Sequence, residues 1–359
     1  MQRILTFIFC IPIIVIADDA PAAGSPLFAS AEPIKMTITA PMRELVGKRK
    51  SKPQYEALLQ FEDANGIMQE MTVGLKPRGN SRLDVCSFPP LRLTIDPQQA
   101  AGTVFENQGH LKMVTQCKTT RSAADWLQLE YGIYLAYNQV SDYSYRARRV
   151  DVTFHDTESE RWERKQSAFL IEPTADAAAR LQREVIRPPR ANANQFNKKE
   201  TANSALFQFL IGNTDFAIKR GPSGEGCCHN NRLLAPAGSQ GDWIALPYDF
   251  DQAGLINTDY ALPDAQFRIK KVTARLYRGF CWHHDELIET VALFKEHRDK
   301  ITAAIIADGL SNRKLRSVSR YIDGFYNIIN EPKNLQRQIV DRCRGSDSLP
   351  VRKTTVTTQ

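Results

Sequence analysis

The sequence predicts an α+β fold, in which strands dominate the first half of the chain and helices the last quarter. Short apolar runs at 36–40, 55–61 and 66–75, broken by Pro53 and by an Asn-Gly pair, are typical of strands and a hairpin. From residue 285 onward, apolar residues recur at helical spacing. A chain of 359 residues is long enough for one large domain or for two lobes that share a cleft.

The start of the chain has the pattern of a secretory signal peptide over residues 1–17. Arg3 precedes an apolar run over 4–16 that is short for a membrane span, and small residues stand at the expected cleavage position. An uncleaved anchor is the alternative. We therefore expect an exported protein, periplasmic or secreted, with no later membrane span and with a flexible leader over 18–34.

Export gives the cysteines a structural role. Without Cys10, six remain, and an even number in an oxidising compartment favours disulfides, although six cysteines allow fifteen pairings. A zinc site is the alternative, built from two clusters, Cys227-Cys228-His229 and Cys281-Trp282-His283-His284, neither of which has the usual paired-cysteine spacing. We predict disulfides, and for two of them we predict the pairs Cys86–Cys117 and Cys281–Cys343.

The net charge of +7 is modest for a chain of this length. It favours anionic ligands or an anionic envelope surface. It is too small and too dispersed to indicate nucleic acid, and no nucleic-acid-binding motif occurs.

The middle of the chain mixes both kinds of element. Apolar residues on one face predict a helix over 123–140, which carries Glu130 close to the buried stripe. Strands are expected at 146–154 and 167–171. The basic, proline-broken segment 176–199 reads as a helix followed by a mobile connection.

The stretch 206–254 places polar residues at the ends of two apolar elements. A short helix is expected to stop at Gly212, so that Asn213-Thr214-Asp215 forms a turn. An apolar strand over 243–248 then delivers Asp249 and Asp251 at its end.

With Asn230, which lies between these two elements, the three aspartates supply oxygen ligands suited to Mg²⁺ or Mn²⁺. One carboxylate would be left as a base. An ordinary turn and a solvated strand end are the alternative reading.

A second group of polar residues lies in the first half. The basic turn Lys76-Pro77-Arg78-Gly79-Asn80-Ser81 can present backbone N–H groups and an arginine to phosphate oxygens, although it also fits a plain hairpin turn. It is neither a P-loop nor a dinucleotide-binding glycine motif.

Together these segments resemble the CotH family, the spore-coat-protein-H-like kinases, and in particular an exported bacterial branch of it. The resemblance covers roughly residues 70–255. It rests on motifs in the family's order: Arg78-Gly79-Asn80-Ser81, Leu91-Arg92-Leu93, Glu130, Gly212-Asn213-Thr214-Asp215, His229-Asn230 and Tyr248-Asp249-Phe250-Asp251.

The resemblance implies an atypical protein-kinase-like fold of two lobes. The sheet-rich N-terminal lobe would span 35–175 and the mostly helical C-terminal lobe 176–345, with a nucleotide cleft between them. Separately, residues 346–359 lack a core-forming pattern, which predicts a disordered tail.

The resemblance also implies roles for individual residues. Asp215 would be the catalytic base, Asn230 and Asp249 metal ligands, and Asp251 a further ligand or orienting group. A second set of residues would bind the nucleotide phosphates: Arg78, Gly79, Asn80, Arg92 and either Lys112 or Lys76. Glu130 would order a phosphate-binding cation.

Two functions from different classes follow. The first is an exported, metal-dependent phosphotransferase that moves a phosphoryl group from ATP or another nucleotide to a hydroxyl of a protein or envelope molecule. The second is a non-catalytic envelope protein that uses the cleft to bind an anionic ligand. A hydrolase with the same metal site is a third reading.

Overall fold

The computed structural model describes residues 25–63, 65–222, 226–306 and 309–345. Within them, seven strands close into a barrel in the order β1-β2-β3-β4-β5-β7-β6. All neighbours pair antiparallel except β1 and β6, which run parallel. The barrel strands are β1 (Ile34–Ala40), β2 (Tyr55–Glu62), β3 (Met68–Pro77), β4 (Leu91–Ile95), β5 (His110–Thr115), β6 (Ala147–Asp156) and β7 (Ser159–Ile171).

This closure overturns the predicted two-lobed, kinase-like arrangement of a sheet-rich lobe and a helical lobe. Met36 of β1 lies opposite Phe61 of β2 on one side and opposite Val152 of β6 on the other. Because β1 and β6 stand at the two ends of the strand order and pair with each other, the sheet closes on itself, and the expected fold class is wrong. The individual strands predicted at 36–40, 55–61, 66–75 and 146–154 are nevertheless confirmed to within about two residues at each end. The strand predicted at 167–171 is the last part of β7, which begins at Ser159.

The barrel interior is filled by the apolar side chains that alternate along its strands. Every second residue of β1 is buried, as expected for a strand with one face toward a core. Residues from neighbouring strands meet inside, and those that are fully buried include Leu59, Phe61, Leu75, Leu93 and Leu111.

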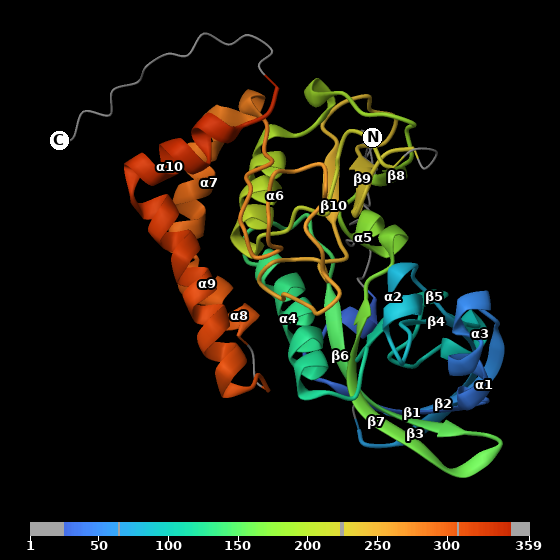
Figure 1. The fold of residues 1–359 in the computed structure, drawn as a ribbon. Helices are drawn as coiled ribbons and strands as arrows, with labels where there is room; N and C mark the ends of the chain where they lie inside the picture. Colours follow the sequence, from blue (N-terminus) through green and yellow to red (C-terminus); the bar gives the residue numbers. More distant parts are fainter. Residues whose placement is uncertain (1–24, 64, 223–225, 307–308, 346–359) are drawn as a thin grey trace, which may run out of the picture.

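The remaining elements form helices and a three-stranded antiparallel sheet in the order β10-β9-β8 (Figure 1). Its strands are β8 (Glu184–Ile186), β9 (Asn231–Ala235) and β10 (Ile244–Pro247). The α-helices are α1 (Met42–Gly47), α2 (Ser81–Val85), α3 (Pro97–Ala100), α4 (Arg121–Tyr137), α5 (Thr174–Arg180), α6 (Lys198–Ile211), α7 (His284–Glu296), α8 (Arg298–Ile305), α9 (Asn312–Asn330) and α10 (Pro332–Gln338). Single 3₁₀ turns occur at Pro26–Phe28, Arg49–Ser51, Ala193–Gln195, Cys281–His283 and Val340–Arg342.

A second hydrophobic core, separate from the barrel interior, has helices α4 and α6 at its centre. Helix α4 packs against β6, β7 and α8, and α6 packs against β10, α7 and α9. In Figure 1 the C-terminal helices α7 to α10 line the side of α4 and α6 that faces away from the barrel. Gly132 permits the close approach of α4 to α8, because a Cβ there would lie 2.7 Å from the Ala304 carbonyl oxygen.

The predicted boundaries around the central stretch are confirmed. Helix α6 ends at Ile211, and Gly212 follows with a φ of 64°, the left-handed conformation in which glycine ends helices. Strand β10 ends at Pro247, directly before Tyr248 and Asp249. Segment 176–199 differs from its prediction, since only a short helix, α5, is followed by β8, which pairs with β9.

The N-terminal part of the described chain packs on the barrel. The predicted signal peptide, the first part of the predicted leader and the tail over 346–359 lie outside the described residues. Within the rest of the leader, Leu27 is fully buried and its carbonyl accepts a hydrogen bond from the Arg148 guanidinium at 2.9 Å. This part is therefore ordered by packing. Among the described residues, the helices are too short or too polar to cross a membrane.

The six cysteines outside residues 1–24 form three disulfides. The pairs Cys86–Cys117 and Cys281–Cys343 are those predicted, and Cys227 bonds to its neighbour Cys228. Disulfides persist in oxidising compartments, so the pairing indicates a protein that functions outside the cytoplasm.

Candidate functional site

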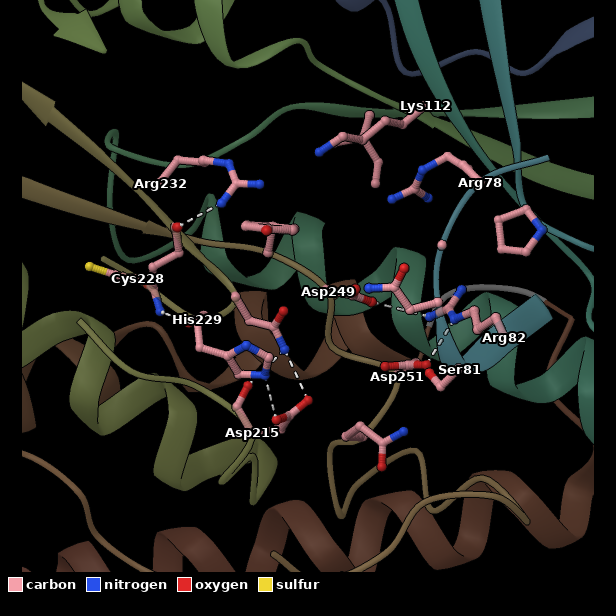
Figure 2. Close-up of a pocket in the computed structure, with 18 of the residues that line it drawn as sticks. Arg78, Ser81, Arg82, Lys112, Asp215, Cys228, His229, Arg232, Asp249 and Asp251 are labelled. Atoms are coloured by element: carbon pink, nitrogen blue, oxygen red, sulfur yellow. Dashed lines mark hydrogen bonds and ion pairs between the residues drawn. The ribbon is translucent and has the colours of Figure 1, made fainter. Parts of the chain in front are cut away.

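A large pocket opens between one end of the barrel and the β8-β9-β10 sheet, with a volume of about 1300 Å³ (Figure 2). One side is lined by the turn after β3, by α2, and by β4, β5 and α4. The other is lined by the turn after α6, by the start of β9 and by the residues after β10. The ten residues predicted to form a site all line this pocket: Arg78, Gly79, Asn80, Arg92, Lys112, Glu130, Asp215, Asn230, Asp249 and Asp251.

Asp215 is held by both of its carboxylate oxygens. The Asn213 side chain accepts a hydrogen bond from the Asp215 N–H at 2.9 Å, which shapes the turn after α6. The Asp215 Oδ1 lies 2.8 Å from His229 Nε2, and the Asp215 Oδ2 accepts a hydrogen bond from the Asn230 amide nitrogen at 2.9 Å. That amide nitrogen also donates to the Asp215 backbone carbonyl, so the carboxylate has one fixed orientation toward the pocket.

Asp249 lines the same pocket as Asp215 and lies just after the end of β10. Its N–H donates to the Tyr134 hydroxyl at 3.1 Å, and the neighbouring Tyr248 N–H donates to the Asn230 carbonyl. Asn230 and Asp249 both have a positive φ, 48° and 62°. Asparagine and aspartate tolerate this conformation better than other side chains, and such residues concentrate at functional sites.

Arg82 is shared by three carboxylates that line the pocket. Its guanidinium donates to both Glu130 oxygens at 2.8 and 2.7 Å and to Asp251 Oδ2 at 2.8 Å, and it lies 3.5 Å from Asp249 Oδ1. Burial raises the pKa of Glu130 and of Asp251, and the Asp249 charge raises both further, while Arg82 opposes these effects. The cluster is thus a buried network with one cation for three acids.

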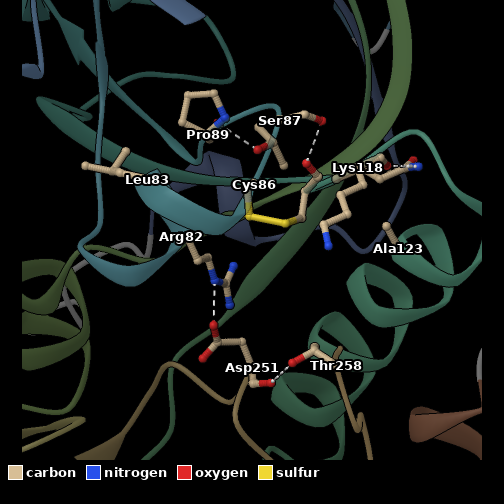
Figure 3. The surroundings of a disulfide bond; sticks show 12 residues. Arg82, Leu83, Cys86, Ser87, Pro89, Lys118, Ala123, Asp251 and Thr258 are labelled. Atoms are coloured by element: carbon tan, nitrogen blue, oxygen red, sulfur yellow. Dashed lines mark hydrogen bonds and ion pairs between the residues drawn. A yellow bond between two sulfur atoms is a disulfide. The ribbon is translucent and has the colours of Figure 1, made fainter. Parts of the chain in front are cut away.

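The Cys86–Cys117 disulfide fixes the helix that carries Arg82. Cys86 directly follows α2 and its bridge ties that helix to the segment after β5. The Ser87 hydroxyl and the Phe88 N–H both donate to the Cys117 carbonyl. Figure 3 shows Arg82 extending from this tethered helix to Asp251.

A second group of cations, Arg78, Lys112 and Arg232, projects into the pocket above Asp249 (Figure 2). Lys112 and Arg232 each lie 4.7 Å from the centre of the Tyr248 ring. None of the three forms an ion pair with a carboxylate among the described residues. Burial, followed by the charges of Arg78 and Arg232, lowers the pKa of Lys112 to about 8. We call these three residues the cationic wall.

The structure corrects the expected partner of Glu130. Arg92, Lys112 and Lys76 were the candidates for the cation that this glutamate orders, whereas the guanidinium in contact with it is that of Arg82. Arg92 is exposed on β4 at the pocket edge. Gly79, with a φ of 98°, and Asn80 form the turn that leads into α2.

Sequence reasoning missed Arg82, His229 as the partner of Asp215, and Arg232. Arg82 lies four residues after Arg78, just past the recognised motif, and nothing local marks it as the member that turns inward. Arg232 is the second residue of β9, and its position directly after the recognised His229-Asn230 pair is the signal that could have placed it at the site.

The fit of Mg²⁺ or Mn²⁺ differs among the three expected ligands. The Asp249 side chain is 39% exposed in the pocket, and the Asn230 amide oxygen lies opposite the nitrogen that holds Asp215. The Asp251 side chain is only 8% exposed and is bound to Arg82, so it orients that arginine. In the described parts of the chain, no three His, Cys, Asp or Glu side chains are grouped as a metal site.

No protein-family model matches the chain, and no curated protein matches it.

Proposed function

We propose that this protein binds a nucleotide polyphosphate in the pocket and transfers its terminal phosphoryl group to a hydroxyl, with Asp215 as the proton acceptor. One observation carries the proposal. The cationic wall, which has no carboxylate partner among the described residues, faces a pocket that also contains an oriented, partly exposed aspartate. Cations of this kind attract phosphate, and a positioned carboxylate completes what phosphoryl transfer requires.

The cations and the aspartate would have different roles in the reaction. Arg78, Lys112 and Arg232 would bind phosphate oxygens and reduce the charge that opposes nucleophilic attack. His229 and Asn230 hold Asp215 so that one carboxylate oxygen can accept the proton of an incoming hydroxyl. A pocket of about 1300 Å³ has room for a nucleotide and part of an acceptor.

A divalent cation fits this scheme only together with the ligand. Asp249 and the Asn230 amide oxygen would hold it, and it would supply further neutralisation of phosphate charge. Mg²⁺ usually binds through one or two carboxylates, phosphate oxygens and water, so two protein ligands are sufficient when a polyphosphate is present.

The experiment is a thermal-shift titration of the oxidised protein with ATP, AMP and pyrophosphate, each with and without Mg²⁺, followed by a turnover assay. We expect ATP with Mg²⁺ to raise the melting temperature in proportion to the logarithm of its concentration, and Mg²⁺ alone to have little effect. Turnover is measured as ADP formed and as label from γ-labelled ATP on protein or in phosphate.

Asp215→Asn tests the base. It should retain ATP binding and lose turnover by on the order of 100-fold or more. The matched control is Asp259→Asn, which removes an exposed carboxylate that pairs with Lys118 away from the pocket lining and should leave turnover near that of the unmodified protein. Equal turnover in Asp215→Asn and the unmodified protein would refute the assignment.

A non-catalytic anion-binding protein is the second candidate. The observation in its favour is that both oxygens of Asp215 already accept hydrogen bonds. Binding of pyrophosphate or ATP without turnover, and with the same affinity in Asp215→Asn, would support this second function.

A further inference from the structure

Arg278 contacts the backbone on both sides of Asp215. It lies in a segment without regular secondary structure before the Cys281–His283 turn, and it is 6% exposed. Its Nη1 donates to the carbonyl oxygens of Thr214 and Phe216, each at 2.5 Å. Since these carbonyls belong to the residues directly before and after Asp215, one guanidinium spans the turn.

The burial of Arg278 is unusual because its hydrogen-bond acceptors are uncharged. Its guanidinium lies 4.6 Å from the Phe216 ring centre and 4.4 Å from that of Phe267. Within the described residues it forms no ion pair with a carboxylate. Burial, followed by the charge of Arg344, lowers the pKa of Arg278 to about 10, and the charges of Asp264 and Asp215 oppose this effect. A buried cation whose hydrogen-bond acceptors are all uncharged carbonyls contributes little to stability, which points to a role in the turn that it spans.

The segment that carries Arg278 is itself anchored. The Arg344 side chain donates to the Arg278 carbonyl at 2.9 Å, and the Arg344 N–H donates to the Gly279 carbonyl at 2.8 Å. The Cys281 N–H donates to the Arg344 carbonyl, and Cys281 is bonded to Cys343. The hydrogen bonds of Arg344 and the disulfide therefore hold the backbone at Arg278 in place.

We propose that Arg278 is a positioning residue for Asp215, which holds the turn at 214–216 in the conformation that turnover requires. The inference rests on the proposed phosphotransfer for its kinetic consequence. It acts through the backbone and does not involve contact with the nucleotide. Because a displacement of about 1 Å at a reacting group can reduce a rate on the order of 100-fold, loss of this clamp should act on kcat.

The experiment compares Arg278→Gln and Arg278→Lys with the control Arg275→Lys. Arg275 is a suitable control, since its guanidinium also donates to backbone carbonyls, those of Phe209, Leu210 and Tyr321, none of which flanks Asp215. We expect Arg278→Gln to lower kcat by on the order of 100-fold with KM for ATP changed by less than about threefold. Arg278→Lys should recover part of kcat, and Arg275→Lys should change it little.

Hydrogen exchange gives a readout that needs no turnover. The Ala217 N–H donates to the His229 carbonyl at 2.9 Å, so loosening of the turn should accelerate exchange at Asp215 and Ala217. We expect this acceleration in both Arg278 variants and not in Arg275→Lys.

Three outcomes would overturn the inference: unchanged kcat in a folded Arg278→Gln variant, an equal loss of kcat in Arg275→Lys, or unchanged exchange at Asp215 and Ala217 in both Arg278 variants. If the unmodified protein shows no turnover with any nucleotide, the proposed function fails, and the exchange rates alone still decide whether Arg278 holds the turn.

Discussion

Arg82 and the cationic wall line the same pocket and differ in what surrounds their charge. Arg82 donates to Glu130 and Asp251 and lies near Asp249, so its charge is more than balanced within the protein. Arg78 and Lys112 have no such carboxylate partner among the described residues, and the pKa of both is lowered, mainly by burial. The first group stabilises the folded protein, and the second is available to an anion.

This difference shows why residue type alone does not identify a phosphate-binding cation. Arg78 and Arg82 are four residues apart, and both line the pocket. The neighbouring acids decide which of them is available, because a guanidinium with two close carboxylates already has its strongest acceptors.

The largest effect should separate these two arginines by stability. Arg82→Met leaves Glu130 and Asp251 buried without their cation, and we expect the free energy of unfolding to fall by about 3–5 kcal/mol. Arg78→Met removes a buried charge that has no carboxylate partner, so it should change that free energy by less than about 1 kcal/mol. Chemical denaturation of the oxidised proteins measures both values. Equal losses in the two variants would show that the distinction drawn here is wrong.

A smaller effect should appear in the pH dependence of anion binding. The pKa of Lys112 is lowered to about 8, so in the absence of ligand its charge is lost as pH rises through that value. The contribution of Lys112 to pyrophosphate affinity should therefore be constant below about pH 7 and fall above pH 8. The same lowered pKa affects folding stability. Between about pH 8 and the pKa of Lys112 in the unfolded chain, near 10.4, the unfolded chain binds the additional proton, so the contribution of Lys112 to stability rises with pH in this range.

Lys112→Arg is the matched variant for this measurement. Arginine keeps its charge across the range, so calorimetric titrations with pyrophosphate at pH 6.5 to 9 should show a flatter profile than the unmodified protein. An identical decline in both proteins would assign the pH dependence to another group.

The smallest effect is expected at Arg92, which the sequence had placed among the phosphate-binding residues. Since Arg92 is exposed at the pocket edge, Arg92→Gln should weaken pyrophosphate binding by less than about threefold. Lys112→Met, tested in parallel, should weaken it about 10- to 100-fold through loss of a charge-assisted hydrogen bond. A large loss in Arg92→Gln would extend the cationic wall to the pocket edge.

Local signals predicted the elements well and their assembly poorly. Proline, glycine and alternating apolar residues marked the barrel strands, and Gly212 marked the end of α6. The parallel pairing of β1 with β6 joins Met36 to Val152, and no local pattern specifies a pairing between segments so far apart in the chain. The closed barrel depends on that pairing, which is why the fold class was predicted wrongly.

The same limit applies to the site. Asp215 and Asp249 follow recognisable element ends, so the sequence indicated both. Arg82 pairs with Asp251 across 169 residues, and only the folded chain reveals that contact. Two disulfide pairs were predicted correctly, while the roles of the site residues as base, metal ligands and phosphate ligands stay predictions.

We expect the conformation of the turn at Asp215 to depend on whether the distant Cys281–Cys343 disulfide has formed. Neither cysteine lines the pocket, yet their bond secures the segment from which Arg278 reaches the carbonyls beside Asp215. Cys343 is also synthesised well after Asp215, so the disulfide that anchors Arg278 can form only after most of the chain has been synthesised. We expect a reduced chain to hold its carboxylate loosely, so that the protein matures into its working form only where disulfides form.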